Sequence, residues 1–408
     1  MVSKWMIKSM LCVLLAVPFA TSLPANGQDS DDDEVPLSVP QSSLPGSGYS
    51  SLPSANNVKF IIVAFRNCNR NPTKYFPDFK YNEPLMREAA SQKIGRRGAV
   101  AFGEFLRKRY GHIIPLEHTA SKVIAYTSSS DRCQISLQSV MIGLYPFDYK
   151  SGNLWEAVPY QVNEQWLSMF KLMQNGKCPG LTPIFESVSG DNSTTANDWL
   201  DKNQELVEYI TQNSGLNKTL TGVSDIAGTI GNLDLLNLPQ PVWVTNPALK
   251  NPPKDLYGEI MAYADPKQSL CANDTRCSKM VSGNWLQHVI DILKQLDKKG
   301  LKKGASAHFY ATHMENVFSL IRLMKAEGVR TVDAAGGFVL EYTDEPKSAV
   351  RFIIVEPNAK LADVKASVKP FSFCGNNLWC PLDKFIDNVK ENAFDDWKTV
   401  CNAAKCVE

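Results

Sequence analysis

VKFIIVAFRNCNRNP, residues 58–72, is the stretch that decides the fold. It begins with a nearly continuous apolar run of strand length, which is typical of a parallel strand buried on both faces of a sheet. The run ends in the polar segment RNCNRNP, which predicts a loop at the carboxyl end of that strand. Because open α/β sheets bind their ligands at this edge, the sequence predicts a functional site in residues 66–72.

Outside this stretch the sequence alternates between strand-like and helix-like segments. The expected elements are a helix at residues 83–110, a strand at 122–130, a helix at 131–145, a strand at 308–312, a helix ending at 325, and strands at 337–342 and 349–356. The last two strands flank the turn signal DEPKS and predict a hairpin. This order predicts an α/β fold, with a central and mostly parallel sheet flanked by helices.

Composition divides the chain further. At the N-terminus, Lys4 and Lys8 precede an apolar run, and Ala25 and Gly27 are small residues suited to signal-peptide cleavage. The segment that follows is rich in Ser, Pro and acidic residues and predicts a flexible tail. The expected parts are a signal peptide (1–27), a tail (28–57), an α/β domain (58–145 and 266–408) and an inserted, mainly helical cap domain (146–265).

Whole-chain composition predicts a secreted, extracellular globular protein. The 408 residues are 44% hydrophobic with a net charge of +1, which allows a large core and argues against a nucleic-acid or membrane-surface partner. No run after the signal peptide reaches the roughly 18 apolar residues that a bilayer span needs. Secretion predicts disulfides among the cysteines other than Cys12, and N-glycosylation at Asn192, Asn217 and Asn273.

Four short motifs resemble those of histidine acid phosphatases. RNCNRNP (66–72) keeps the spacing of R-H-G-x-R-x-P, and DRCQIS (131–136) is similar to the family's D-R-x-x-x-S segment. YATH (310–313) resembles the start of Y-x-x-H-D, and residues 374–401 resemble the family's C-terminal end. The resemblance covers residues 58–401 and implies the family's sheet with its inserted cap. The chain also resembles secreted acid phosphatase-like proteins of arthropod saliva and venom, in particular those of fleas.

The family pattern implies a phosphohistidine mechanism, from which this chain departs at the reacting groups. In the family a histidine attacks phosphorus, three arginines and a second histidine hold the phosphoryl oxygens, and an acid protonates the leaving group. Here Asn67 stands at the nucleophile position and Met314 at the acid position. Neither an amide nor a thioether performs that chemistry, so we expect an inactive phosphatase. The anion-binding residues that the resemblance carries over are Arg66, Arg70, Arg132 and His313.

Two residues leave room for residual chemistry. Glu315 gives the H-x-E form of the inositol-polyphosphate branch, so it is either a general acid or a helix N-terminal residue favoured by the helix dipole. Cys68 is either a substitute nucleophile or a disulfide-bonded or inert cysteine. A cysteine phosphatase needs a longer loop between its cysteine and arginine than the single Asn69 found here. We therefore favour an inert or disulfide-bonded Cys68.

The remaining cysteines and histidines predict structural roles. The resemblance implies the disulfides Cys133–Cys401 and Cys374–Cys380, and the short spacing of Cys271 and Cys277 suggests a local bridge. No partner is assigned to Cys68, Cys178 and Cys406. The histidines besides His313 are scattered singly, so we expect no metal and no other cofactor; they are His112, His118, His288 and His308.

The sequence keeps the family's anion-binding residues, here called the cradle (Arg66, Arg70, Arg132 and His313), but lacks the nucleophile. This combination predicts a binding protein. Buried arginines without an anion are costly, so we expect a small molecule in the former phosphate pocket, unless Asp131, Glu315 or solvent anions satisfy the arginines. The candidate ligands are host mediators. A leukotriene would place its carboxylate on the three arginines. A biogenic amine such as serotonin or histamine would need a carboxylate and the aromatic faces of Tyr75 and Phe76.

Two other functions are consistent with the same sequence. One is an active secreted acid phosphatase that hydrolyses phosphate monoesters with an unrecognised nucleophile. The other is an interaction protein or toxin component whose exterior carries the function. A homodimer is compatible with each of them.

Overall fold

The computed structural model describes residues 52–72, 74–77, 88–147, 157–299, 304–375 and 377–402. These residues belong to one compact unit. The predicted signal peptide, most of the predicted tail, and Cys406 lie outside the described residues.

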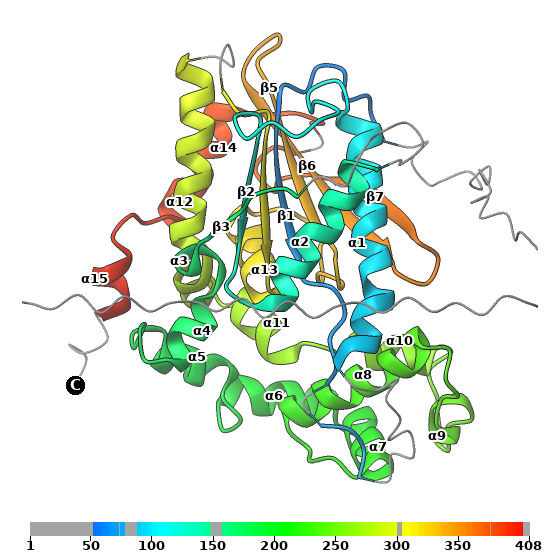
Figure 1. Ribbon diagram of the computed structural model, residues 1–408. Helices are drawn as coiled ribbons and strands as arrows, with labels where there is room; N and C mark the ends of the chain where they lie inside the picture. Colours follow the sequence, from blue (N-terminus) through cyan, green and yellow to red (C-terminus); the bar gives the residue numbers. More distant parts are fainter. Residues whose placement is uncertain are drawn as a thin grey trace, which may run out of the picture. The chain divides into compact units, whose positions relative to one another are not determined.

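A sheet of eight strands forms the centre of the fold (Figure 1). The strands are β1 (Phe60–Arg66), β2 (Val123–Thr127), β3 (Gln161–Val162), β4 (Ala307–Thr312), β5 (Gly337–Thr343), β6 (Ala349–Asn358), β7 (Asp363–Lys369) and β8 (Cys380–Pro381). Their order is β3-β2-β4-β1-β5-β6-β7, and β8 pairs with β6. From β3 to β1 all neighbours are parallel, whereas β5, β6, β7 and β8 pair antiparallel. The predicted α/β class and the predicted hairpin at β5 and β6 are confirmed.

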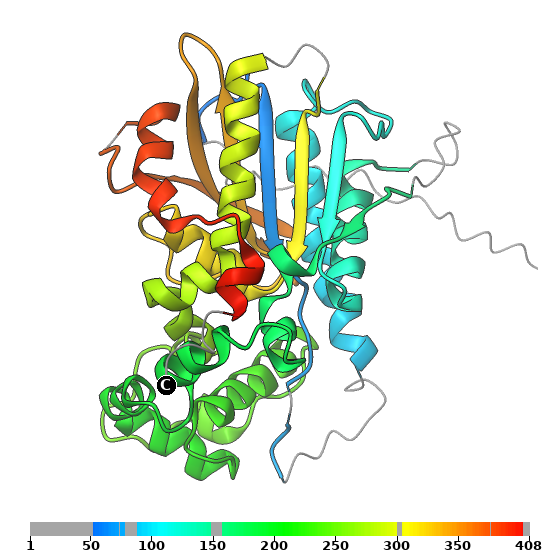
Figure 2. The same cartoon turned by 90° about the vertical axis from the view of Figure 1, so that its left-hand side faces the viewer.

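Helices cover both faces of the sheet. The helices are α1 (Glu88–Tyr110), α2 (Asp131–Leu144), α3 (Glu164–Leu167), α4 (Met169–Gln174), α5 (Leu181–Ser189), α6 (Thr194–Lys202), α7 (Gln204–Ser214), α8 (Leu220–Leu235), α9 (Val242–Thr245), α10 (Leu256–Met261), α11 (Pro266–Asn273), α12 (Thr275–Lys299), α13 (Met314–Leu323), α14 (Leu382–Val389), the 3-10 helix η3 (Lys390–Asn392) and α15 (Trp397–Asn402). Helices α1 and α2 lie on one face, and α12, α13 and α14 lie on the other (Figures 1 and 2).

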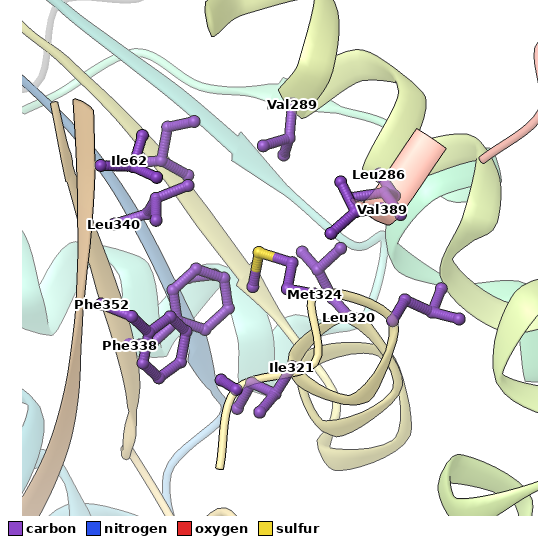
Figure 3. Close-up of a cluster of buried hydrophobic side chains, with 14 of the residues drawn as sticks. Ile62, Leu286, Val289, Leu320, Ile321, Met324, Phe338, Leu340, Phe352 and Val389 are labelled. Carbon is purple, nitrogen blue, oxygen red and sulfur yellow. The ribbon is translucent and has the colours of Figure 1, made fainter. Parts of the chain in front are cut away.

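Strand β1 is buried on both sides, as its apolar run predicts. Ile62 packs into the core under α12, α13 and α14, and its neighbours Ile61 and Val63 pack into the core under α1 and α2. Figure 3 shows the first of these cores, in which Phe338 and Phe352 from β5 and β6 meet aliphatic side chains of the helices. A strand between two cores cannot shift by one residue without exchanging its two faces. Burial of both faces of β1 therefore fixes the position of the residues that follow it.

The carboxyl ends of β1, β4 and β2 point toward a group of shorter helices (Figure 2). Helices α6 to α10 contribute to a separate core that includes Ile210, Ile226 and Ile260. These helices fall largely within residues 146–265, for which the sequence predicts a cap. The boundaries of that cap stay a prediction.

Three disulfides are present among the described residues. Cys271–Cys277 and Cys374–Cys380 form as expected. The expected Cys133–Cys401 bridge is wrong, because Cys401 in α15 is bonded to Cys178, which precedes α5. Cys133 is a free, buried cysteine on α2. The sulfur of Cys133 lies 3.7 Å from the imidazole Nδ1 of His313, at the carboxyl end of β4. Cys401 lies elsewhere, where its carbonyl oxygen accepts a hydrogen bond from the backbone N–H of Gly180 (2.7 Å).

A buried carboxylate, Glu341 on β5, ties α1 to the sheet. It is fully buried and accepts hydrogen bonds from Arg109 (2.9 Å), from the hydroxyl of Tyr110 (2.6 Å) and from Arg351 on β6. The two arginines also donate to the carbonyl oxygens of Pro53 and Ser54, at 2.9 Å each. One carboxylate therefore joins α1, two strands and the chain that enters β1.

Candidate functional site

The site forms at the carboxyl ends of three adjacent strands, two of which carry predicted site residues. Arg66 is the last residue of β1, and His313 directly follows β4. Ser128 follows β2, and its backbone N–H donates to the carbonyl of Ala311 in β4 (3.1 Å). Parallel strands bring these ends together at one edge of the sheet, so three segments far apart in the sequence meet there.

Asn67 occupies the position expected for the nucleophile and is held on all sides. Only 4% of its surface is exposed. Its side-chain amide donates to the carbonyl oxygen of Cys68 (2.7 Å), and its backbone N–H donates to Thr312 at the end of β4 (2.8 Å). Its own carbonyl accepts from the N–H of Ala335 (3.1 Å). The side-chain nitrogen of Asn67 thus donates its hydrogen bond to the backbone.

His313 is a neutral, fixed imidazole. Arg132 donates Nη2–H to its Nδ1 (3.0 Å), so that nitrogen carries a lone pair, and Nε2 carries the proton and faces the hydroxyl of Ser128 (3.1 Å). Burial, followed by the positive charges of Arg132, Arg66 and Arg70, lowers the pKa of His313 to about 3. The family resemblance predicts that His313 binds phosphoryl oxygens. In this structure it brings no positive charge to that task above about pH 3.

The two candidates for the acid role, Met314 and Glu315, are the first two residues of α13 and lie in different surroundings. Met314 is 2% exposed and packs into the core beside Val317 and Phe318. Glu315 is partly exposed, yet loss of solvent raises the pKa of its carboxyl more than its own backbone N–H and the charges of Arg132 and Arg66 lower it. Met314 therefore points away from the site, and Glu315 is the acid that faces the arginines.

The three arginines differ in how they are satisfied. Arg66 donates Nη1–H to Asp265 (2.7 Å) and to the carbonyl of Val332 (2.9 Å). Arg70 donates to the carbonyl of Asn71 (3.1 Å), and burial, followed by the charges of its arginine neighbours, lowers the pKa of its guanidinium. Arg132 is bonded to His313, and its Nε is buried without a hydrogen-bond partner among the described residues.

A cavity of about 320 Å³ opens beside this cradle. Its walls are the loop from Arg66 to Pro72, one side of α8, Tyr257 and Met261 of α10, and the turns near residues 331–334 and 357–360. Arg66 and Arg70 reach it, whereas Arg132, His313 and Glu315 are not among its lining residues. Four carboxylates line the cavity, which are those of Asp225, Asp234, Asp265 and Asp333, against the cations Arg66, Arg70 and Lys360.

The structure places the two predicted aromatic residues away from the cavity walls. Phe76 packs against Trp243 in the core of the cap helices, with ring centroids 5.9 Å apart. Tyr75 hydrogen-bonds Asn232 of α8, which does line the cavity. Asp131 is exposed at the start of α2. The aromatic face that the cavity does offer is Tyr257, which the sequence did not indicate.

Asp265 is the site residue that sequence reasoning missed. It lies 199 positions from Arg66 and precedes Pro266, a pattern typical of a helix N-cap. The structure does place it at the N-cap of α11, but its side chain makes no capping hydrogen bond and goes to Arg66 instead. No linear spacing signals a contact of this kind.

The two free cysteines near the site, Cys68 and Cys133, are buried. Cys68 is 5% exposed, and burial raises the pKa of its thiol more than its hydrogen bond with Ser136 and the charge of Arg96 lower it. Burial raises the pKa of Cys133 to about 12. A thiol rather than a thiolate stands at both positions at neutral pH, which favours the inert interpretation of Cys68.

Two other histidines share one buried tyrosine. His288 of α12 and His308 of β4 both contact the hydroxyl of Tyr310, at 2.9 and 3.2 Å. Burial lowers the pKa of each to about 4. Within the described part of the chain, His, Cys, Asp and Glu form no group of three able to hold a metal ion. None of the helices described there is long and apolar enough to cross a membrane.

Comparisons with known proteins find similarity to phosphatases. Residues 57–221 match the family model of the histidine phosphatase superfamily (branch 2). Human prostatic acid phosphatase is 20% identical over 378 residues, which are 85% of this chain and 88% of that protein. Rat lysosomal acid phosphatase is 23% identical over 203 residues, 47% of this chain and 46% of the relative. The chain thus spans about half the length of the lysosomal relative.

A solved structure extends the likeness to the whole fold. The phytase of Hafnia alvei, in complex with tartrate, superposes with a TM-score of 0.65 at 14% identity. The match covers 86% of this chain and 99% of the phytase. At this identity the likeness establishes the fold, while activity depends on the residues at the strand ends.

Proposed function

Because this chain carries a domain of the histidine phosphatase superfamily (branch 2), we propose that it is a secreted, non-catalytic relative of the acid phosphatases that binds a small molecule. The ligand would lie in the cavity beside the former phosphate cradle. Its relatives are named acid phosphatases, and their reaction does not pass to this chain with the fold.

The main support for this proposal is Asn67, the residue at the nucleophile position. A phosphohistidine reaction needs a nucleophilic lone pair at this position, and the amide nitrogen of Asn67 instead donates a proton to the carbonyl of Cys68. The nearest sulfur nucleophile is protonated, since burial raises the pKa of Cys68. Loss of the nucleophile from a cooperating catalytic set costs on the order of a millionfold in rate. Glu315 alone does not replace a nucleophile.

The first test is hydrolysis of p-nitrophenyl phosphate between pH 4 and pH 8. The full chain is expected to release no more p-nitrophenol than a buffer blank, because no group at the strand ends attacks phosphorus. Hydrolysis that disappears in Cys68→Ser would instead establish a cysteine nucleophile. Hydrolysis that disappears in Glu315→Gln but not in Cys68→Ser would assign the residual chemistry to Glu315. Either result would make the protein an active acid phosphatase.

Size and polarity of the cavity favour a compact polar ligand. A volume of about 320 Å³ lies at the small end of the roughly 300–1,000 Å³ typical of ligand pockets. Carboxylates such as that of the exposed Asp333 suit an ammonium group, and Tyr257 adds an aromatic ring to the wall. A biogenic amine such as serotonin or histamine therefore fits these walls better than the long apolar chain of a leukotriene.

Calorimetric titration with serotonin, histamine and a leukotriene tests the ligand. We expect saturable binding of at least one amine, and weakening by Asp333→Asn because it removes an exposed carboxylate from the cavity wall. Lys218→Gln serves as a control, since Lys218 pairs with Glu208 on the exposed side of the cap helices. Absence of binding to all three compounds at micromolar concentration would contradict a mediator-binding role.

A further inference from the structure

Asp265 stands where an external anion would be expected. Its Oδ2 lies 2.7 Å from Nη1 of Arg66, and the two side chains are 6% and 15% exposed. The same Arg66 nitrogen donates to the carbonyl of Val332, so both of its protons are used. Removal of solvent strengthens a charge-assisted hydrogen bond of this kind. An anion that approached Nε or Nη2 of the same guanidinium would lie beside a carboxylate that is already in place.

The position of Asp265 in the fold supports a role at the site. An aspartate before Pro266 at the start of α11 would ordinarily cap the helix, but its side chain makes no capping bond here. Helix α11 thus forgoes a stabilising contact while Asp265 reaches across to β1. The carboxylate belongs to the cap side of the cavity, and the guanidinium belongs to the sheet side.

Of the other cradle groups, Arg132 keeps its positive charge but does not line the cavity. Arg132 is bonded to His313, which is neutral, and Glu315 adds a carboxyl close to Arg132 and Arg66. Of the two arginines that line the cavity, Arg66 is paired with a carboxylate, whereas the hydrogen bond of Arg70 goes to a backbone oxygen. Around the cavity the four carboxylates outnumber the three cations. Such a wall opposes a dianion such as a phosphate monoester.

We propose that Asp265 is an internal counter-ion that occupies the Arg66 end of the cradle and determines the class of ligand. It excludes phosphate dianions and leaves Arg70 as a hydrogen-bond donor to a neutral polar group of the ligand, such as a hydroxyl. This rests on the proposed binding function and deepens it, because it explains how a phosphatase-type cradle would be closed to phosphate.

Titration with inorganic phosphate tests the role of Asp265. The full chain is expected to show no saturable binding at millimolar phosphate. Asp265→Asn removes the competing carboxylate and is expected to bind phosphate about tenfold more tightly or better. Asp265→Ser, which keeps a favoured N-cap residue at the start of α11, is expected to gain the same affinity. Asp265→Glu keeps the charge and should remain as weak as the wild type.

Asp333→Asn is the matched control. It removes the same charge from an exposed residue of the same cavity wall, so a general charge effect would appear in both variants. Equal gains in Asp333→Asn and Asp265→Asn, or no gain in either Asp265→Asn or Asp265→Ser, would overturn the proposal. Hydrolysis of p-nitrophenyl phosphate by the wild type would overturn the proposed function instead, so the two failures are distinguishable.

Discussion

Replacing Glu341 by glutamine is expected to lower the free energy of unfolding by about 3–5 kcal/mol. The carboxylate is fully buried and compensates Arg109 and Arg351, which also hold Pro53 and Ser54. A neutral amide leaves two guanidinium groups with reduced compensation in a place that water does not reach. It also turns an acceptor of the network into a donor that faces other donors. Chemical denaturation followed by circular dichroism measures the change.

An exposed ion pair provides the control for this prediction. Glu345 pairs with Lys59 at 3.2 Å, and its side chain is 62% exposed. Solvent screens such a pair, so Glu345→Gln is expected to change the free energy of unfolding by less than about 1 kcal/mol. Similar losses in Glu341→Gln and Glu345→Gln would mean that the buried network contributes no more than a surface pair.

Acidification from pH 7 to pH 5 is expected to destabilise the fold by about 2 kcal/mol for each of His308 and His313. Burial lowers the pKa of these residues to about 4 and about 3, while the unfolded chain takes up protons near its ordinary value of 6.5. The unfolded state therefore binds more protons below pH 6.5. Stability is complete above that pH and is lost as the pH falls toward 4. Denaturation midpoints across this range measure the slope.

Substitution identifies the histidine responsible. His308→Gln should reduce the slope by about 1.2 kcal/mol per pH unit between pH 6 and pH 4.5, because it removes one group that must stay neutral. His112→Gln, at an exposed position, should leave the slope unchanged. An unchanged slope in His308→Gln would show that this histidine is not held neutral by burial.

The sequence predicted the framework well, because the relevant signals are local. An apolar run such as that of β1 must be buried on both sides, and DEPKS between two β-like runs leaves few geometries other than a hairpin. The positions of Arg66 and His313 at neighbouring strand ends follow from a parallel sheet. Residues 83–87 of the expected first helix lie outside the described residues, and the described part begins at Glu88.

The interior of the site could not be predicted in the same way. The partner of Arg66 comes from a different part of the fold, and the neutrality of His313 depends on the orientation of the Arg132 guanidinium. Sequence alone supplied the family residues but not which of them are already satisfied internally. The wrong Cys133–Cys401 pairing has a similar cause, since Cys178 approaches α15 only after the cap helices have packed.

The Cys178–Cys401 disulfide has a mechanical consequence for ligand entry. It fastens the segment before α5 to α15, whereas α8 and α10, which line the cavity, lie on the other side of the cap helices in Figure 1. A movement of those helices is therefore most restricted on the side of the disulfide. At the cavity, two ion pairs hold the cap helices to the sheet side, Lys360 with Asp234 of α8 (3.0 Å) and Arg66 with Asp265 (2.7 Å), and both must open before these helices can move away.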